Sequence, residues 1–265
     1  MSLGKASGFA VLSAAPGHGG AVTCTDTTIN GDVGSSGVRA SVVQTNCTIN
    51  GAIVAPVSAQ VVTDFNTAYG KYTDANFPCT GTLNTAYTGE TVTLTPGVYC
   101  NTAGVTFTDS TLILQGDANA VWIFRIGTGG TGALTGTNFT VVMDGGGEPC
   151  NVTWWVAEAV TMTTSGFQGT ILAGAAITMT GLAGSTTPFN GNALAKAAVT
   201  LTNVTVNGCN ATGGGSPSQS KCNQGVGNGP EGCDPGNSNQ GNPFRSNDEL
   251  GGKPGDPGRK GGNKK

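Results

Sequence analysis

Ionisable side chains are scarce in this sequence. Charged residues make up only 10% of its 265 residues, and His18 is the single histidine. Soluble domains usually contain about 25% charged residues. A nucleophilic triad needs a positioned base, and a surface that binds nucleic acid needs many lysines and arginines. The composition argues against both, and we expect no nucleic-acid partner.

Metal-binding and membrane-spanning patterns are missing as well. No C-x-x-C pair occurs, and the acidic turns do not complete a calcium-ligand pattern. No apolar run approaches the roughly 20 residues that a transmembrane helix needs. We therefore expect no metal, no cofactor and no transmembrane segment.

Eight cysteines stand in this weakly charged chain. They indicate disulfides and an oxidising compartment, although the sequence does not choose among the possible pairings. Cys222 and Cys233 would close a short local loop. No signal peptide is visible, because Met1 leads straight into domain-like sequence. We expect a secreted, extracellular protein whose signal peptide is absent from the printed sequence.

A short motif recurs three times between Cys150 and Cys209. Alanine is followed by an aliphatic residue, threonine, a second aliphatic residue and threonine at 159–163, 176–180 and 198–202. Repeats of roughly 20 residues that carry short β-type runs are typical of a solenoid, in which each coil buries its apolar face against its neighbours. The expected fold is mainly β, with the coils stacked as a β-solenoid.

The motif also predicts which side chains point outward. Successive side chains of a strand alternate between its two faces. Because the aliphatic residues must form the interior, the two threonines of each copy share the outer face. The question is then what this outer row of threonines does.

A second motif links the two ends of the chain. Thr-Ile-Asn-Gly at 28–31 returns at 48–51, and Thr-Val-Asn-Gly follows at 205–208. Equivalent positions in adjacent coils would explain the likeness, and chance in a chain so rich in these residues is the rival explanation. The first explanation predicts a discontinuous solenoid in which the start of the chain packs beside its end.

Residues 56–76 differ from the rest of the chain. Apolar residues recur there at spacings of three and four, which indicates an amphipathic helix, with Pro56 in its first turn and Pro78 beyond its end. We expect this helix to lie against the flank of the coils. Residues 120–126 are expected to form a strand buried on both faces except at Arg125.

The chain divides into two parts by composition. Residues 1–210 form the expected solenoid domain, and residues 211–265 are rich in glycine, proline and asparagine with few large apolar side chains. Such a segment buries too little surface to offset its ordering entropy. We expect residues 211–265 to be a disordered tail.

Outward threonines in stacked coils would form a two-dimensional grid. Side chains two residues apart lie about 6.6–6.8 Å apart, and neighbouring strands about 4.7–4.8 Å apart. A rigid grid of methyl and hydroxyl groups can hold water in an ice-like arrangement. The alternative is that β-branched threonine merely suits outward strand positions.

An enzyme is a further alternative, because some β-solenoids act on polysaccharides. Asp109, Asp117, Asp144, Glu148 and Glu158 could supply a pair of carboxylates. Most of these acids fall in Gly- and Asn-rich turns, where Asp is expected for backbone reasons. We expect no enzymatic activity.

Several segments together resemble the microbial ice-binding-like family. They are Gly-Asp-Val-Gly at 31–34, Leu-Thr-Pro-Gly-Val-Tyr-Cys at 94–100, and the segments 116–126, 150–156, 167–173 and 191–195. The resemblance covers about residues 3–208. It implies a secreted protein with a right-handed, discontinuous β-solenoid of roughly triangular section and one long helix alongside. It also implies adsorption to ice through one flat face.

In some members of that family the ice-binding face carries Thr-Ala/Gly-x-Thr/Asn, which residues 135–138 match. The run 181–189 departs from the family, because it is longer than its counterpart and contains Pro188; we expect it to bulge from one coil. The leading hypothesis is a monomeric antifreeze protein whose partner is the ice surface, and the alternative is an adhesin or glycan-binding solenoid. The expected ice-binding residues are Thr135, Thr137, Asn138, Thr161, Thr163, Ser165, Thr178, Thr180, Thr200, Thr202, Asn203 and Thr205.

Overall fold

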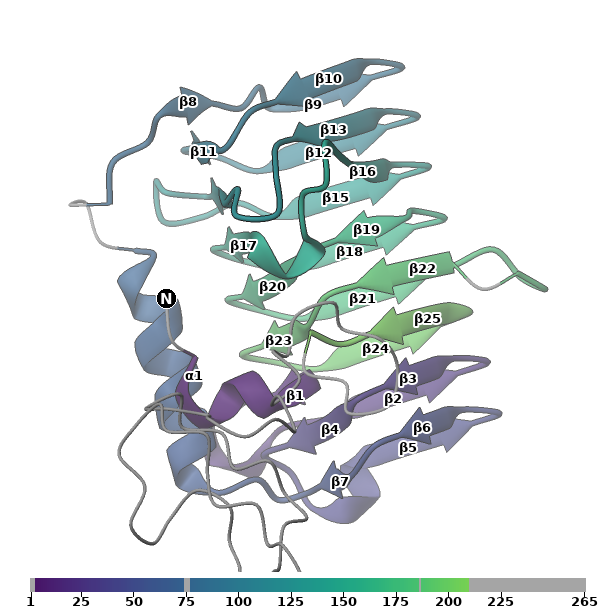
Figure 1. Ribbon diagram of the computed structural model, residues 1–265. Helices are drawn as coiled ribbons and strands as arrows, with labels where there is room; N and C mark the ends of the chain where they lie inside the picture. Colours follow the sequence, from purple (N-terminus) through teal and green to yellow (C-terminus); the bar gives the residue numbers. More distant parts are fainter. Residues whose placement is uncertain (1–2, 74–76, 186, 210–265) are drawn as a thin grey trace, which may run out of the picture. The chain divides into compact units, whose positions relative to one another are not determined.

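The chain folds into a stack of parallel β-coils with one α-helix along its side (Figure 1). The structure is a computed structural model that describes residues 3–73, 77–185 and 187–209. Each coil contributes strands to three faces, and strands of successive coils pair in parallel register. The expected mainly β solenoid with an accompanying helix is confirmed. The expected tail, 211–265, and Cys222 and Cys233 within it lie outside the described residues.

The first face, called the helix face because α1 lies on it, is a nine-stranded sheet. Its strands in spatial order are β7 (Ile53–Val54), β4 (Asp32–Ser35), β1 (Phe9–Ser13), β23 (Ala193–Ala195), β20 (Thr170–Ala173), β17 (Val152–Val156), β14 (Trp122–Ile126), β11 (Gly97–Asn101) and β8 (Gly81–Thr82).

The second face, called the threonine face, is an unbroken eight-stranded sheet. Its strands in spatial order are β5 (Val42–Thr45), β2 (Val22–Thr25), β24 (Val199–Thr202), β21 (Ile177–Thr180), β18 (Val160–Thr163), β15 (Leu134–Thr137), β12 (Val105–Thr108) and β9 (Ala86–Thr88).

The third face is divided into two sheets. The upper sheet holds β10 (Thr91–Leu94), β13 (Thr111–Gln115) and β16 (Thr140–Asp144). The lower sheet holds β19 (Phe167–Gln168), β22 (Thr187–Asn190), β25 (Val204–Asn207), β3 (Thr28–Asn30) and β6 (Thr48–Asn50). A single bridge between Thr140 and Gly166 joins the two sheets. Four 3₁₀ turns complete the described elements: η1 (Gly4–Gly8), η2 (Pro16–His18), η3 (Arg39–Ser41) and η4 (Pro149–Asn151).

The solenoid is discontinuous, as the sequence predicts. The N-terminal strands lie directly beneath the C-terminal ones, so purple strands adjoin green strands in Figure 1. Thr28 pairs with Thr205 on one side and with Thr48 on the other, which places the three copies of the second motif in register. The chain thus starts near the bottom, and its last coils fill the middle of the stack.

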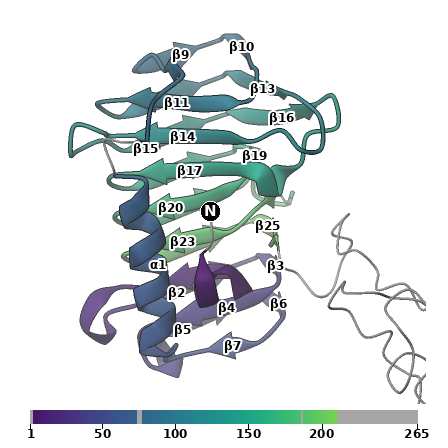
Figure 2. The ribbon, with the colours of Figure 1, turned by 60° about the vertical axis from the view of Figure 1, so that its left-hand side comes forward.

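Helix α1 (Ala59–Lys71) rises along the helix face from the bottom coils to about the level of β17, and the next strand in sequence, β8, lies in the top coil (Figure 2). It is shorter than the expected 56–76, because Ser58 occupies the N-cap position and Pro56 precedes it. The apolar stripe is nevertheless confirmed, since Val61, Phe65 and Tyr69 are buried against the sheet.

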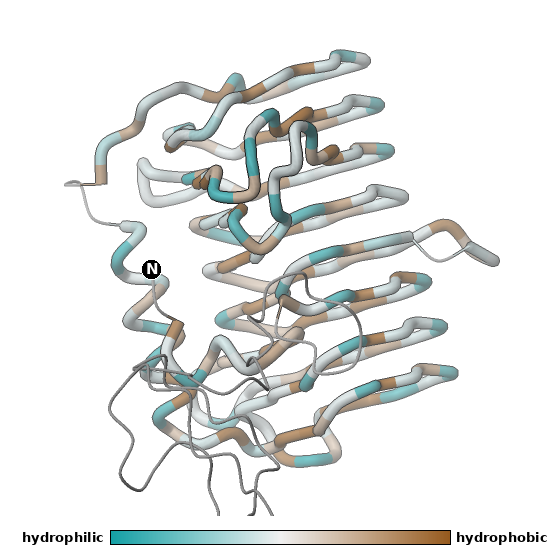
Figure 3. Tube along the Cα trace, viewed as in Figure 1, coloured by the Kyte–Doolittle hydropathy of each residue, from teal (hydrophilic) through white to brown (hydrophobic). Residues whose placement is uncertain are grey.

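Alternation along the strands builds a dry interior filled with aliphatic and aromatic side chains. Figure 3 shows apolar and polar positions alternating along the coils. Phe124 stacks on Trp154 in the next coil with ring centroids 3.8 Å apart, and Phe107 stacks on Phe139 at 4.1 Å. Such pairs contribute about 0.5–1.5 kcal/mol each beyond the area they bury. The stacked rings tie successive coils together.

Arg125 corrects the prediction made for its strand. Residues 122–126 do form β14, but Val121 before it is 48% exposed and Arg125 is only 4% exposed, the reverse of the expected pattern. Its Nε donates to the carbonyl oxygen of Tyr72 (2.8 Å), and its Nη1 donates to that of Phe77. The side chain does point out of the sheet. It is buried because the chain at the end of α1 covers it, and sequence alternation cannot show this.

The bulge expected within 181–189 is present at 181–185, which project at one corner of the coil after β21, whereas 187–189 belong to β22 (Figure 1). Strand β21 keeps its register with β18 and β24, so the loop does not interrupt the threonine face.

Disulfides fasten the solenoid at three places. Cys24 pairs with Cys47 in the bottom coils, Cys79 with Cys100 near the top, and Cys150 with Cys209 beside the last strand. Among the described residues, no helix is long and apolar enough to cross a membrane.

Candidate functional site

The threonine face presents two straight columns of outward side chains. In-register pairing aligns the second and the fourth residue of each four-residue strand across the sheet. From bottom to top, the first column consists of Val43, Thr23, Thr200, Thr178, Thr161, Thr135, Thr106 and Ala86. The second column consists of Thr45, Thr25, Thr202, Thr180, Thr163, Thr137, Thr108 and Thr88. Threonine therefore fills every place except the two ends of the first column.

These threonines are held rigidly, yet their hydroxyls are free. Above the bottom strand β5, where Gln44 is exposed, the residues between them point inward and are buried, as Met162 and Leu201 are. Each interior strand is hydrogen-bonded on both sides, which fixes the spacing at about 4.7–4.8 Å between strands. Within the described residues, none of the threonine hydroxyls of the two columns hydrogen-bonds to another protein group. Their polar capacity is available to solvent.

A row of left-handed residues borders the second column where the chain turns onto the third face. Asp26, Asn46, Asp109, Asn138 and Asn203 all have φ between 46° and 54°. Asn and Asp tolerate this conformation better than other residues with a side chain. Asn138 donates to Asp109 (2.9 Å), and Asn46 donates to Asp26 (2.6 Å). Side chains at this corner are therefore hydrogen-bonded to one another between neighbouring coils. These acids lie at the rim and not within the columns.

The expected site residues do not all lie in the two threonine columns. Asn138 and Asn203 lie at the corner, Ser165 is 7% exposed, and Thr205 lies on β25 of the third face. The eight remaining residues all lie in the two columns: Thr135, Thr137, Thr161, Thr163, Thr178, Thr180, Thr200 and Thr202.

Ser165 has a structural position in the turn. Its hydroxyl donates to the carbonyl oxygen of Thr163 (2.8 Å) and accepts the backbone N–H of Phe139 (3.1 Å). Ser110 and Thr27 make the same bond to the residue two positions earlier. We therefore leave Ser165 and Thr205 out of the candidate surface.

The structure adds threonines that the repeat did not reveal. They come from the N-terminal and the upper coils, where a cysteine, a glutamine, a phenylalanine or a tyrosine replaces the second aliphatic residue of the motif. The residues are Thr23, Thr25, Thr45, Thr88, Thr106 and Thr108. The sequence pattern Val-Thr-x-Thr at 22–25 and at 105–108 could have identified the outward threonines of β2 and β12.

The other two faces are less suited to contact a flat surface. On the helix face, Leu172, Leu194 and Trp155 point outward but are buried beneath α1 and η1. The lower third face carries a ladder of amides in which each side chain donates to the next. Its members are Asn50, Asn30, Asn207, Asn190 and Gln168, with N···O distances of 2.7–2.9 Å.

Comparison with known proteins decides the family. The model of the ice-binding-like family matches residues 17–207. The chain belongs to this family. The match covers every strand of the threonine face, from β2 to β24.

Relatives of known sequence or structure agree with this assignment. An ice-binding protein of Flammulina populicola is 33% identical over 192 residues, which cover 64% of this chain and 74% of the relative. The crystal structure of an ice-binding protein from the Antarctic ascomycete Antarctomyces psychrotrophicus is 28% identical, with a TM-score of 0.65 over 78% of this chain and 97% of the other. An ice-binding protein from an Arctic yeast is 24% identical, with a TM-score of 0.66 over 82% and 96% of the chains, and supports the fold alone.

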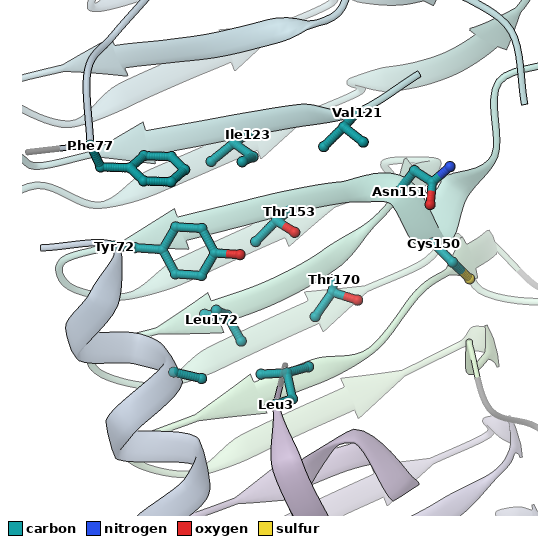
Figure 4. A pocket seen from close by; sticks show the side chains of 11 residues that line it. Leu3, Tyr72, Phe77, Val121, Ile123, Cys150, Asn151, Thr153, Thr170 and Leu172 are labelled. Carbon is teal, nitrogen blue, oxygen red and sulfur yellow. The ribbon is translucent and has the colours of Figure 1, made fainter. Parts of the chain in front are cut away.

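The described part of this ice-binding-like chain also holds a cavity away from the threonine face. About 380 Å³ in volume, it lies between the end of α1 and the helix face, with Tyr72, Ile123 and Leu172 among its walls (Figure 4). A smaller cavity of about 190 Å³ adjoins Arg125 and Trp155. No acidic side chain lines either cavity, and the described residues contain no cluster of three or more His, Cys, Asp or Glu. Neither cavity offers the carboxylate pair that glycoside hydrolysis requires.

The resolved pKa shifts all lie on α1 or beside it: hydrogen bonds from the Lys5 backbone N–H and the Gln60 side chain lower the pKa of Asp64, and the other shifts lie where α1 meets the sheet. Burial raises the pKa of Tyr69 to about 12, and its hydroxyl donates to the carbonyl oxygen of Val156 (3.1 Å). Burial also raises the pKa of Tyr72 and lowers that of Lys196, whose Nζ lies 3.9 Å from the centre of the Tyr69 ring. The two threonine columns contain no ionisable group.

Proposed function

We propose that this protein adsorbs to ice through the threonine face and so slows ice growth and recrystallisation. The main support is that two in-register columns of threonine span eight parallel strands with no charged residue among them. Membership of the ice-binding-like family and similarity to ice-binding proteins support the same activity.

The chemistry of threonine suits this contact. Each side chain presents a methyl group, which discourages liquid-like hydration, and a hydroxyl group, which holds a water molecule in place. A charged side chain would keep a tightly bound, disordered hydration shell instead. Because every hydroxyl is free and every backbone position is fixed by the coils, the face can order water over its full length.

Adsorption by such a face limits crystal growth for a geometric reason. Ice that advances between adsorbed molecules must curve outward, and a curved ice surface has a lower local freezing point. Ice binding of this kind is a non-enzymatic function. We further propose that the protein acts outside the cell, which the three disulfides support, and that it works as a monomer.

The test replaces threonines in the first column by a larger side chain. Thr161→Tyr, Thr178→Tyr and Thr200→Tyr should each remove most of the thermal hysteresis, because one protruding ring lifts its neighbours off the ice. Thr67→Tyr, on the exposed side of α1, is the matched control. Circular dichroism melts should show all four variants folded. Full activity in all three face variants would move the site to another surface.

A further inference from the structure

The upper sheet of the third face presents mainly β-branched side chains. Strands β10, β13 and β16 pair in register, so their outward residues form two columns of β-branched side chains; beyond these columns, at the ends of β13 and β16, the exposed Gln115 donates to Asp144 (3.2 Å). Thr91, Thr111 and Thr140 form the first column. Thr93, Ile113 and Val142 form the second. All six are β-branched and uncharged, and we call them the upper patch.

The upper patch is accessible. Thr91, Thr93, Thr140 and Val142 are exposed, and Val142 keeps 39% of its surface open, which is high for a large apolar residue. Within the described chain, none of the four threonine hydroxyls has a hydrogen-bond partner. The four threonines of the patch therefore repeat the methyl and hydroxyl groups of the threonine face, and Ile113 and Val142 add methyl groups without hydroxyls.

The lower half of the same face is chemically different. Its first column is interrupted by Gly166 and Pro188 and then resumes with Thr205, Thr28 and Thr48, whereas its second column is the amide ladder. There the amides bind one another, as Asn30 binds Asn207 at 2.7 Å. The change occurs where only the bridge between Thr140 and Gly166 joins the two sheets. Amide side chains occupy the second column in the lower sheet, so the fold does not require β-branched residues at these positions.

The upper patch adjoins the threonine face within the same coils. Only two residues separate Thr108 from Thr111, and only two separate Thr137 from Thr140. The left-handed residue at each corner, Asp109 or Asn138, turns the chain from one face to the next. The two surfaces therefore point in different directions and cannot both lie on one flat plane.

We propose that the upper patch is a second ice-contacting surface, which engages a different set of crystal planes from the threonine face. This inference rests on the proposed function of the threonine face. Ice is the occupant that the structure supports, because the patch presents unpaired threonine side chains like those of the threonine face and is continuous with that face around one corner. A stable protein interface takes about 20–30 residues a side, far more than the six of the upper patch.

The test uses the planes that the protein labels on ice. The protein is coupled to an amine-reactive dye through lysines such as Lys5 and Lys71, which lie away from both surfaces, and is bound to a single-crystal ice hemisphere. The wild type should label the planes of both surfaces. Thr111→Tyr should lose one set of planes and keep the other. Thr28→Tyr, in the same column of the lower half, should label as the wild type does.

A second variant keeps the test decisive if Thr111→Tyr fails to fold. Ile113→Asn combined with Val142→Asn gives the upper patch the amides that the lower half tolerates, and it should lose the same set of planes. Unchanged labelling by both variants overturns the inference. The proposed function fails separately: if Thr178→Tyr still labels every plane, or if the wild type labels none, the threonine face is not the ice-binding site.

Discussion

Thr23 lies beside Thr200 in register on β2 and β24, although the two residues come from opposite ends of the described chain. The pair lies at the seam where the N-terminal coils meet the last C-terminal coil. Because both threonines occupy the same column, the threonine face crosses the seam without a step. A surface that must match a crystal over its whole length depends on such continuity.

The seam predicts that N-terminal threonines matter as much as those of the repeat. We expect much less of the Thr23→Tyr protein than of the wild type to be incorporated into a slowly grown ice hemisphere. The same result is expected for Thr178→Tyr. Thr88→Tyr in the top coil should cost less, because that threonine has a neighbour in its column on one side only. Thr67→Tyr again serves as the control. Normal incorporation of the Thr23 variant would confine the site to the upper strands.

A variant of Ser165 can distinguish a hydroxyl that stabilises the fold from one that binds ice. Ser165→Ala leaves the buried N–H of Phe139 without its acceptor, which should lower the free energy of unfolding by about 1–3 kcal/mol. Thermal hysteresis near 0 °C should stay unchanged, because the hydroxyl never reaches the surface. Thr163→Tyr, two residues earlier, should show the reverse pattern in urea unfolding and hysteresis measurements. Lost hysteresis in a folded Ser165→Ala protein would return this residue to the site.

Local chain geometry explains what the sequence could predict. Alternation along a strand is a property of the backbone, so the outward direction of Thr161 and Thr178 followed from their spacing alone. The likeness of Thr-Ile-Asn-Gly at 28–31 to Thr-Val-Asn-Gly at 205–208 predicted that Thr28 and Thr205 lie in adjacent coils, because stacked positions in a solenoid meet the same surroundings.

Contacts between distant segments explain what the sequence could not predict. Thr202 and Thr205 are close in sequence, yet Asn203 turns the chain with φ of 54° and sends them to different faces. Arg125 points outward as alternation requires, and it is buried only because the end of α1 happens to cover it. Neither outcome can be read from the spacing of residues within one segment.

The disulfide between Cys150 and Cys209 should support stability and not ice binding. It joins residues 59 positions apart, at a distance from the threonine columns. Replacing both cysteines by serine should cost about 2–5 kcal/mol of unfolding free energy and lower the melting temperature. Ice affinity measured near 0 °C should remain. A melting temperature equal to that of the wild type would show that the last strand is held by its sheet pairing alone.

Tyr69 should make the protein sensitive to alkaline pH. Its folded-state pKa of about 12 lies above the ordinary value of 10.0, so the folded state holds the phenolic proton more tightly than the unfolded chain. The resulting stability is complete below pH 10 and is lost as pH rises towards 12. Tyr72 acts in the same direction, whereas Lys196, with its lowered pKa, acts in the opposite one.

The control for this pH dependence is Tyr69→Phe. This variant should be less stable at neutral pH by about 1 kcal/mol, because the hydrogen bonds to Val156 and Ala157 are lost. Above pH 10 its stability should fall less steeply than that of the wild type, since one buried proton no longer has to leave. Urea unfolding at a series of pH values measures both effects. Parallel curves for the two proteins would show that Tyr69 does not govern the alkaline loss, and that the contact between α1 and the sheet breaks for another reason.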